Sequence, residues 1–439
     1  MPRTRGTGSG AYDAHRARTL RNVRDTMTTC IVIPTFWTRR GGRSSDRLIN
    51  VYDHPTPIDG DSPLPTCLRS LESVRDVGKV IILVAATDSS IAHEAEDRVC
   101  NMVADFPALD TMVFGPAELG SLHRRLEQLE FPDMVSGVSL TGYGAVRNTG
   151  LIVAATLGAD VCVFIDDDEV ITDPDFLHVG VEGLGMKTPD GKVLFAKTGY
   201  YVDAMGGHFL KDDAHWTDAF WRQTDEYNRA MGAVDAGPRV KPTALAFGGC
   251  MALHRDMYAN VSFDPWVLRG EDFDYVINAR MHGGDMFLDS AWQVAHHPPE
   301  LASAALQFRQ DVYRFVYEHR KLEFAKSQID LRRVTAASLR PYPGEFVGAG
   351  VSWRAFATAI LRALAGREPG AHLSIAKAVF TDAARYARRN CDNYFAFQRR
   401  WPLLMERLWE DVALGSLFSG ERQIDRTAIT GRFPVIPGN

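Results

Sequence analysis

The stretch VRNTGLIVAATLGADVCVFIDDDEVITDPDF, residues 146–176, decides the fold that the sequence predicts. Its first part belongs to an apolar run over residues 143–159 that favours a helix. Residues 160–170 follow as a β-branched, apolar run that ends in an acidic loop. A buried helix followed directly by a buried strand is typical of proteins in which helices cover a central sheet.

Further buried strands are predicted upstream of this stretch. TTCIVIPTF (28–36), KVIILVAATD (79–88) and TMVFG (111–115) are short apolar runs, and helical patterns lie between them. This alternation predicts an α/β fold with a mostly parallel sheet flanked by helices. Ligands of such sheets bind outside the carboxyl ends of the strands. Asp88 and residues 166–168 stand at such ends, which is the first indication of function.

Three regions are predicted along the 439 residues. Residues 1–27 form a flexible basic tail, 28–300 an α/β domain, and 301–439 a helical region in which apolar residues recur every three or four positions. Residues 37–65 form a long polar loop inside the α/β domain. Its YDHPTP segment is either a plain ordered loop or a part of the site.

Composition narrows the class of protein. The net charge of −6 hides basic ends and an acidic middle, which argues against a nucleic-acid surface in the middle. Six cysteines without a CxxC pair predict buried, reduced thiols in a cytoplasmic protein. No run is apolar and long enough to span a membrane. The basic C-terminal helices either pack on their own domain, lie on an anionic membrane surface, bind an anionic substrate or mediate self-association.

The acidic triplet Asp166, Asp167 and Asp168 carries the chemistry. Three adjacent carboxylates repel one another unless a cation or hydrogen-bond donors compensate them. Mg²⁺ and Mn²⁺ prefer such hard oxygen ligands, and Mg²⁺ is usually held by one or two carboxylates together with substrate phosphates. Alternate residues of an extended segment point in opposite directions, so the first and third aspartates can act on different groups. A solvated acidic turn is the plain alternative.

These motifs resemble the family 2 glycosyltransferases that use nucleotide diphosphate sugars. In that family an Arg-Asn-x-Gly helix precedes an apolar strand and an Asp-x-Asp turn, as RNTG and IDDDE do here. CIVIPTF and PLPTCLRSLESV resemble the family's first strand and helix, and AFGGCMALHR with RGEDFDYVINARMHGGD resembles its second half. The resemblance covers residues 28–300. It implies a glycosyltransferase-A fold, a UDP- or GDP-sugar donor, with UDP favoured, and an unidentified hydroxyl acceptor.

The resemblance also implies roles for individual residues. Mn²⁺ or Mg²⁺ would be held by Asp166, Asp168 and His296, with His297 as the less favoured histidine. Asp272 would be the general base, beside Glu271, in an inverting reaction; its plain alternative is a helix cap. The donor would be bound by Pro34, Thr35, Asp88, Arg147, Asp166, Asp167, Gly248 and Gly249. Before Asp88 the chain has VAAT where the family has an acidic, Gly-containing run.

Three alternatives stay open at this point. A retaining glycosyltransferase shares the fold and a similar Gly-Gly strand. A sugar-1-phosphate nucleotidyltransferase also combines a parallel sheet with an acidic metal pair. Such enzymes have a Gly-rich, basic phosphate loop after the first strand, which RRGGR (39–43) resembles only weakly. A non-catalytic scaffold that binds sugars or nucleotides ranks third. The aromatic residues between 200 and 227 either stack on sugar rings or fill the core.

Overall fold

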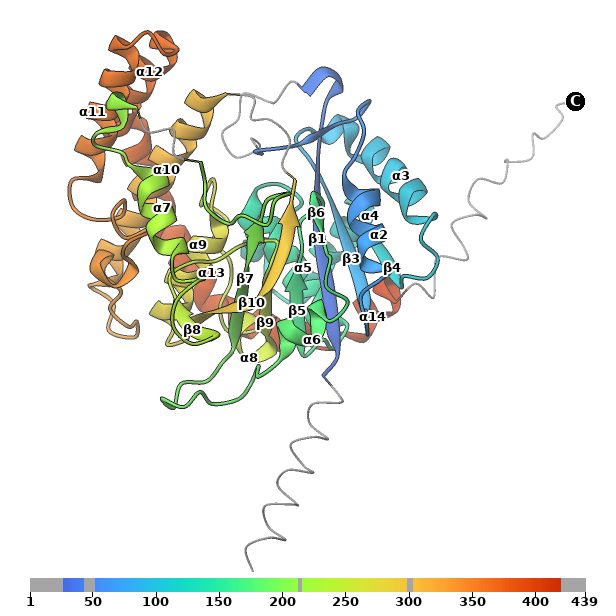
Figure 1. Cartoon of the computed structure of the whole chain (residues 1–439). Coiled ribbons are helices and arrows are strands. Elements are labelled where there is room, and N and C mark those ends of the chain that lie inside the picture. Colours follow the sequence, from blue (N-terminus) through green and yellow to red (C-terminus); the bar gives the residue numbers. More distant parts are fainter. Residues whose placement is uncertain (1–26, 43–51, 212–214, 298–302, 420–439) are drawn as a thin grey trace, which may run out of the picture.

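The computed structural model describes residues 27–42, 52–211, 215–297 and 303–419, and a ten-stranded sheet runs through its centre. The strand order is β4-β3-β1-β5-β9-β7-β10-β6, with β2 paired to β1 and β8 paired to β10 (Figure 1). The strands are β1 (Thr29–Thr38), β2 (Thr56–Pro57), β3 (Lys79–Ala86), β4 (Thr111–Phe114), β5 (Val161–Phe164), β6 (Glu169–Val170), β7 (Ala196–Val202), β8 (Val240–Thr243), β9 (Met251–His254) and β10 (Met286–His296). Most of the tail predicted at 1–27 and part of the loop at 37–65 lie outside the described residues.

The sheet is parallel in its first half and mixed in its second. β4, β3, β1 and β5 pair in parallel, whereas β9 runs antiparallel to both β5 and β7. The parallel half confirms the strands predicted at 28–36, 79–88 and 111–115. Within the AFGGCMALHR segment only β9 pairs in the sheet, and Gly248 and Gly249 before it form a turn.

Helices cover both faces of the sheet, as predicted. They are α2 (Leu64–Leu71), α3 (Ala92–Val103), α4 (Pro116–Gln128), α5 (Tyr143–Thr156), α6 (Phe176–Val181), α7 (Gln223–Met231), α8 (Arg255–Tyr258), α9 (Glu271–Met281), α10 (Ala304–Ala325), α11 (Val351–Leu364), α12 (Pro369–Ala378), α13 (Ala384–Leu408) and α14 (Val412–Phe418). Strand β1 shows the two cores: Ile31 and Ile33 pack in the core that α2 and α3 cover, and Val32 packs in the core of α4 and α5. Both faces of β1 are therefore dry, as in other parallel sheets.

Helix α5 is buried along its whole length, and its RNTG sequence explains how it packs. A Cβ on Gly150 would lie 2.7 Å from Val32 Cγ1, so glycine lets the helix approach β1 closely. The Asn148 side chain donates to the carbonyls of Gly137 and Phe263, both at 3.1 Å. The motif thus fixes the helix against the sheet and against the loop that leads to α9.

The C-terminal helices pack on the α/β half. Residues of α13 and α14 share the hydrophobic core of α4 and α5, and Trp401 Nε1 donates to the Tyr258 carbonyl at 2.8 Å. Helices α10, α11 and α12 lie beside α7, at the end of the sheet away from β4 and α3 (Figure 1). The helical C-terminal extension is confirmed. Among the described residues, no helix has the length and apolar character that crossing a membrane requires.

Candidate active site

A cavity of about 1240 Å³ opens where β1, β5 and β10 end, between the sheet and the C-terminal helices. Such a volume exceeds the range of roughly 300–1,000 Å³ that is common for sites of one small ligand. Many of the residues that the sequence singled out line it together: Pro34, Arg147, Asp166, Asp167, Asp168, Gly248, Glu271, Asp272 and His296. The carboxyl ends of the strands and the start of α9 therefore meet in one space.

Asp168 and His296 lie next to each other in the lining of this cavity. Strand β6 pairs antiparallel with the end of β10, so that His296 lies opposite Glu169. This register brings His296 Nε2 to 3.4 Å from Asp168 Oδ2. Burial pushes the pKa of Asp168 upward, but the hydrogen bond and charge of His296 and the charge of His54 outweigh it and hold the pKa below its usual value. His297 contributes only its backbone N–H, which donates to the Asp168 carbonyl at 3.2 Å.

This pair fits a divalent cation, because one ion can contact both a carboxylate oxygen and an imidazole nitrogen that lie so close together. No set of three or more His, Cys, Asp or Glu side chains converges on one point among the described residues. A cation held here would have these two protein side chains as adjacent ligands and would need substrate phosphates to complete its shell. The third predicted ligand, Asp166, is instead bonded to an arginine, and its role as a metal ligand stays a prediction.

Arg147 joins the two acidic stretches of the site. Its Nη2 donates to Asp166 Oδ1 at 2.8 Å, and its Nε donates to Glu271 Oε1 at 3.2 Å. The guanidinium lies over the ring of Phe164, 5.0 Å from its centre, and its Nη1 makes no hydrogen bond to the described residues. Arg147 thus places a buried positive charge between the two acidic turns, and its side chain lines the cavity.

Asp272 lies in the first turn of α9, at the cavity wall. Its Oδ2 accepts from Gly248 N at 3.1 Å, and its Oδ1 accepts from Phe273 N at 2.8 Å. The cap position belongs to Gly270, whose φ of 66° is left-handed, so Asp272 is not the helix cap of the plain alternative. Burial raises the pKa of Asp272, and Arg314 opposes this rise. Burial also raises the pKa of Glu271 to about 7, against the effect of Arg147.

The two glycines before β9 have neighbours of their own. A Cβ on Gly249 would lie 1.9 Å from Glu169 Oε1, and one on Gly248 would lie 2.5 Å from Arg147 Nη2. A side chain at either position would therefore force the Arg147 guanidinium or the Glu169 carboxylate to shift. Whether the donor sugar also approaches them, as predicted, stays a prediction.

Glu169 and His54 are site residues that the sequence analysis missed. The Glu169 side chain is 0% exposed, and its Oε2 accepts from Asp166 N at 2.9 Å, which shapes the acidic turn from beneath. His54 lines the cavity, and its Nδ1 is buried without a hydrogen bond to the described residues. The YDHPTP segment could have pointed to His54, and the fourth acidic residue of the DDDE sequence could have pointed to Glu169.

Three predicted donor-binding residues, Asp88, Thr35 and Gly249, are not among the residues that line the cavity. Asp88 ends β3 as expected, but its carboxylate accepts from Arg39 at 2.6 Å and from Ser90 N at 2.8 Å. Thr35 is buried beside Asp167; burial raises the pKa of Asp167 to about 8, and the Thr35 side chain offsets part of this rise. Their contacts with a donor stay predictions.

The far wall of the cavity comes from the aromatic segment and from the C-terminal helices. Tyr201 accepts from Gly249 N at 2.8 Å, and its hydroxyl lies 3.5 Å from Asp166 Oδ2. The remaining wall residues include Trp216, Trp221, Tyr227, Asp311, Arg314, Tyr342 and Arg362. Some aromatics therefore face the site, whereas Trp221 is also buried in the core. The sequence predicted the helices but not their place in the cavity wall.

No protein-family model matches the chain, and no curated protein matches it in sequence. Among solved structures it is similar to the mannosyltransferase PcManGT from Pyrobaculum calidifontis in complex with GDP-Man and Mn²⁺, at 14% identity and a TM-score of 0.44, over 90% of this chain and 95% of that one. It is also similar to a mycobacterial protein, at 15% identity and a TM-score of 0.37, over 68% of this chain and 76% of that one. A third similar structure is GalNAc-T7 with UDP, GalNAc and Mn²⁺, at 10% identity and a TM-score of 0.33, over 75% of this chain and 56% of that one. These are distant likenesses, so the roles of the site residues rest on the geometry of this chain.

Proposed function

We propose that the protein is a metal-dependent glycosyltransferase that moves a sugar from a nucleotide diphosphate donor, UDP-sugar before GDP-sugar, to an acceptor hydroxyl. One observation carries the proposal: the Asp168–His296 pair and the candidate base Asp272 line the same cavity. Arg147 connects the two acidic turns that carry them, because it bonds to Asp166 in one and to Glu271 in the other. A scaffold that only binds sugars has no use for a separate buried base.

Asp168 and His296 are the residues that would hold Mn²⁺ or Mg²⁺. When bound, the ion neutralises the charge that develops on the leaving diphosphate. Arg147, whose side chain lines the cavity, adds a fixed positive charge on the protein side that favours the same leaving group. The two alternate aspartates then have different partners: Asp166 forms an ion pair with Arg147, and Asp168 pairs with His296.

Asp272 serves as the general base. The acceptor hydroxyl donates its proton to the Asp272 carboxylate while its oxygen forms the new bond to the anomeric carbon. The bond between that carbon and the diphosphate oxygen breaks, and the nucleoside diphosphate leaves with the electron pair. A single displacement of this kind inverts the anomeric centre. The backbone N–H groups of Gly248 and Phe273 hold the carboxylate in place for this step.

The far lobe of the cavity is the place for the acceptor. The cavity has room for two substrates, and Trp216, Trp221 and Tyr227 line the lobe that lies toward the C-terminal helices. Aromatic faces of this kind stack on sugar rings. Arg362, one of several arginines that line the cavity, forms an ion pair with Asp218 at 2.8 Å.

The test is a panel of UDP- and GDP-sugars offered to the full chain with Mn²⁺, with Mg²⁺ or with EDTA. We expect a donor that raises the melting temperature only with metal, since a ligand at 100 times its Kd stabilises a fold by about 2.7 kcal/mol. We also expect release of the nucleoside diphosphate. Release of pyrophosphate from a nucleoside triphosphate and a sugar-1-phosphate, in a parallel arm, would instead identify a nucleotidyltransferase. Binding of no donor with either metal contradicts the proposal.

A further inference from the structure

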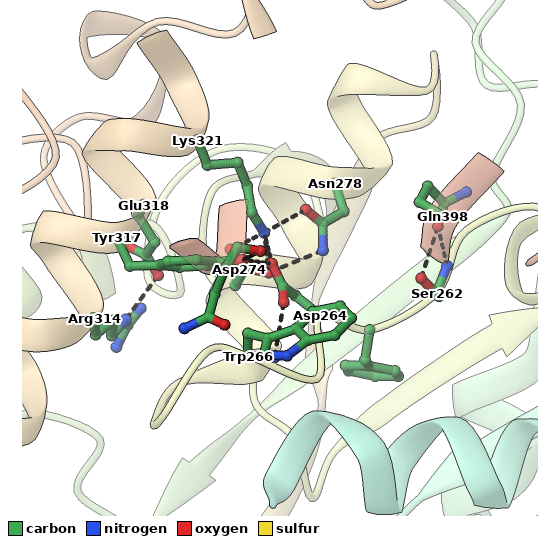
Figure 2. A network of polar contacts seen from close by, with 12 residues as sticks. Ser262, Asp264, Trp266, Asp274, Asn278, Arg314, Tyr317, Glu318, Lys321 and Gln398 are labelled. Atoms are coloured by element: carbon green, nitrogen blue, oxygen red, sulfur yellow. Dashed lines mark hydrogen bonds and ion pairs between the residues drawn. The ribbon is translucent and has the colours of Figure 1, made fainter. Parts of the chain in front are cut away.

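Helix α10 lies outside the stretch that resembles the glycosyltransferase family, yet it is bonded to the helix that carries Asp272. Lys321 of α10 places its Nζ 2.5 Å from Asp264 Oδ2 and 2.7 Å from Asp274 Oδ1. The same ammonium lies 3.0 Å from Asn278 Oδ1, and Tyr317 donates to Asp264 at 2.7 Å. Figure 2 shows these side chains meeting between the two helices. The three charged groups are fully buried, and losing one would leave an uncompensated charge, so the cluster fixes α10 against α9.

Arg314 lies two turns before Lys321 on α10, against the turn that begins α9. Its Nε donates to Glu318 Oε1 at 2.8 Å (Figure 2), and its guanidinium carbon lies 5.1 Å from the ring centre of Phe273. A Cβ on Gly270 would lie 2.1 Å from Arg314 Nη1. The guanidinium thus rests on the residue two positions before Asp272, and only glycine leaves it room.

Arg314 is less fully paired than Lys321. Its side chain is 3% exposed and lines the cavity, and its Nη2 makes no hydrogen bond to the described residues. Glu318 is the carboxylate that forms an ion pair with it, whereas Lys321 is shared by two carboxylates. The positive charge of Arg314 can therefore act on a second acidic group nearby.

Asp272 is that second acidic group. The charged and titratable groups that act electrostatically on it are Arg314 from α10, Arg147 from α5, Tyr201 from β7, Tyr227 from α7 and the adjacent Glu271. Burial raises the pKa of Asp272, and Arg314 is the largest of the influences that oppose this rise. An opposite charge near a carboxylate favours its ionised form.

We propose that Arg314 is a positioning residue for the base: α10 delivers its guanidinium to the turn at Gly270, fixes the shape of that turn and sets a positive charge facing Asp272. The C-terminal region then contributes a functional residue to the active site through α10. This inference rests on the proposed function, because it takes Asp272 as the proton acceptor.

The experiment compares Arg314→Met and Arg314→Lys with Arg320→Met, an exposed position on the same helix. The readout is nucleoside diphosphate release from UDP-glucose and GDP-mannose with Mn²⁺, followed against pH with water and with methyl glucoside as acceptors. We expect Arg314→Met to lower kcat by about tenfold or more at neutral pH. The acid limb, which is the fall of kcat as the pH drops, should move up by about one pH unit or more. The KM for the donor should change by less than about twofold, because Arg314 acts on the base.

Arg314→Lys keeps the charge but not the planar fork, so it should lower kcat and move the acid limb less than the methionine variant does. Arg320→Met should match the wild type in both. A wild-type kcat and acid limb in Arg314→Met overturn the inference. If that variant does not fold, Arg314→Lys decides, and an unchanged kcat and acid limb in it overturn the inference equally.

Failure of this inference and failure of the proposed function give different results. If the wild-type chain releases no nucleoside diphosphate from either donor, the proposed function fails and the inference falls with it. If the wild type is active and the Arg314 variants are unaltered, only the role of Arg314 is lost.

Discussion

The two acidic turns of the cavity are built from the same residue types but surrounded by different neighbours. The turn at Asp166–Asp168 faces His296 and His54, and the pKa of Asp168 is held below its usual value. The turn at Glu271–Asp272 is buried among apolar groups and arginines, and both its pKa values are raised. Carboxylates whose environments push their pKa values apart can take opposite roles, which in our proposal are those of a cation ligand and a proton acceptor. The surroundings, more than the acidic residues themselves, decide the role.

The largest effect should come from removing the charge of the second turn. Asp272→Asn keeps the shape of the side chain but takes away the proton acceptor, so kcat should fall by about 10²- to 10⁴-fold. Donor affinity in the presence of Mn²⁺ should not change, because the cation-binding pair is intact. Initial rates and isothermal titration calorimetry measure the two quantities. Asp256→Asn, at an exposed position of α8, is the matched control. Unchanged turnover would remove Asp272 from the mechanism.

The complementary change is made in the first turn. Asp168→Ala should weaken Mn²⁺-assisted donor binding by at least about 10- to 100-fold, the loss that follows even when a partner of a metal ligand is removed. Donor binding in EDTA should be the same in the variant and the wild type. Calorimetry with and without Mn²⁺ gives both values. Equal metal-assisted affinity in the two proteins would contradict the assignment of Asp168.

A third change probes the support beneath the first turn. Gly249→Ala forces a methyl group against Glu169, whose Oε1 would lie 1.9 Å away, so the variant should lose about 1–3 kcal/mol of unfolding free energy. Gly370→Ala, with nothing within 4 Å of the added carbon, should change it by less than about 1 kcal/mol. Denaturant unfolding measures both. An alanine variant as stable as the wild type would mean that Glu169 moves freely.

The smallest effect is the pH dependence of turnover. Asp272 accepts a proton only when ionised, and its raised pKa means that kcat falls as pH drops through a value above the 3.9 or so of an ordinary aspartate. Well below that pKa the loss approaches about tenfold per pH unit. The same limb should persist in His296→Gln at saturating Mn²⁺, which separates the base from the cation-binding pair. Loss of this pH dependence in the variant would contradict its assignment to Asp272.

Much of the fold and part of the site follow from local sequence patterns. The apolar runs that end at Asp88 and Asp166 predict the parallel strands, and the acidic turns follow because each comes directly after a strand or before a helix. The strand-end argument predicted a site at Asp166–Asp168, whereas Asp272 was assigned to the same site only by the resemblance to the glycosyltransferase family.

The rest depends on contacts between distant residues, which no local pattern encodes. Arg147 and Glu271 are 124 positions apart, and their bond depends on the packing of α5 beside α9. Asp88 is paired with Arg39 because the loop after β1 lies next to β3. The place of α10 in the cavity wall depends on buried charges whose partners the sequence does not reveal. Periodicity predicts a helix but not the surface on which it packs.

The burial of α5 has a consequence for how the chain reaches this state in the cell. Helix α5 is covered on one side by α13, whose residues Phe397, Trp401 and Leu404 share its hydrophobic core. More than two hundred residues separate the two helices. At a translation rate of roughly 5–20 residues per second, the apolar side of α5 waits about 10 to 50 s on the ribosome for its cover. A nascent chain with such an interval is a natural client for chaperones that bind exposed apolar segments.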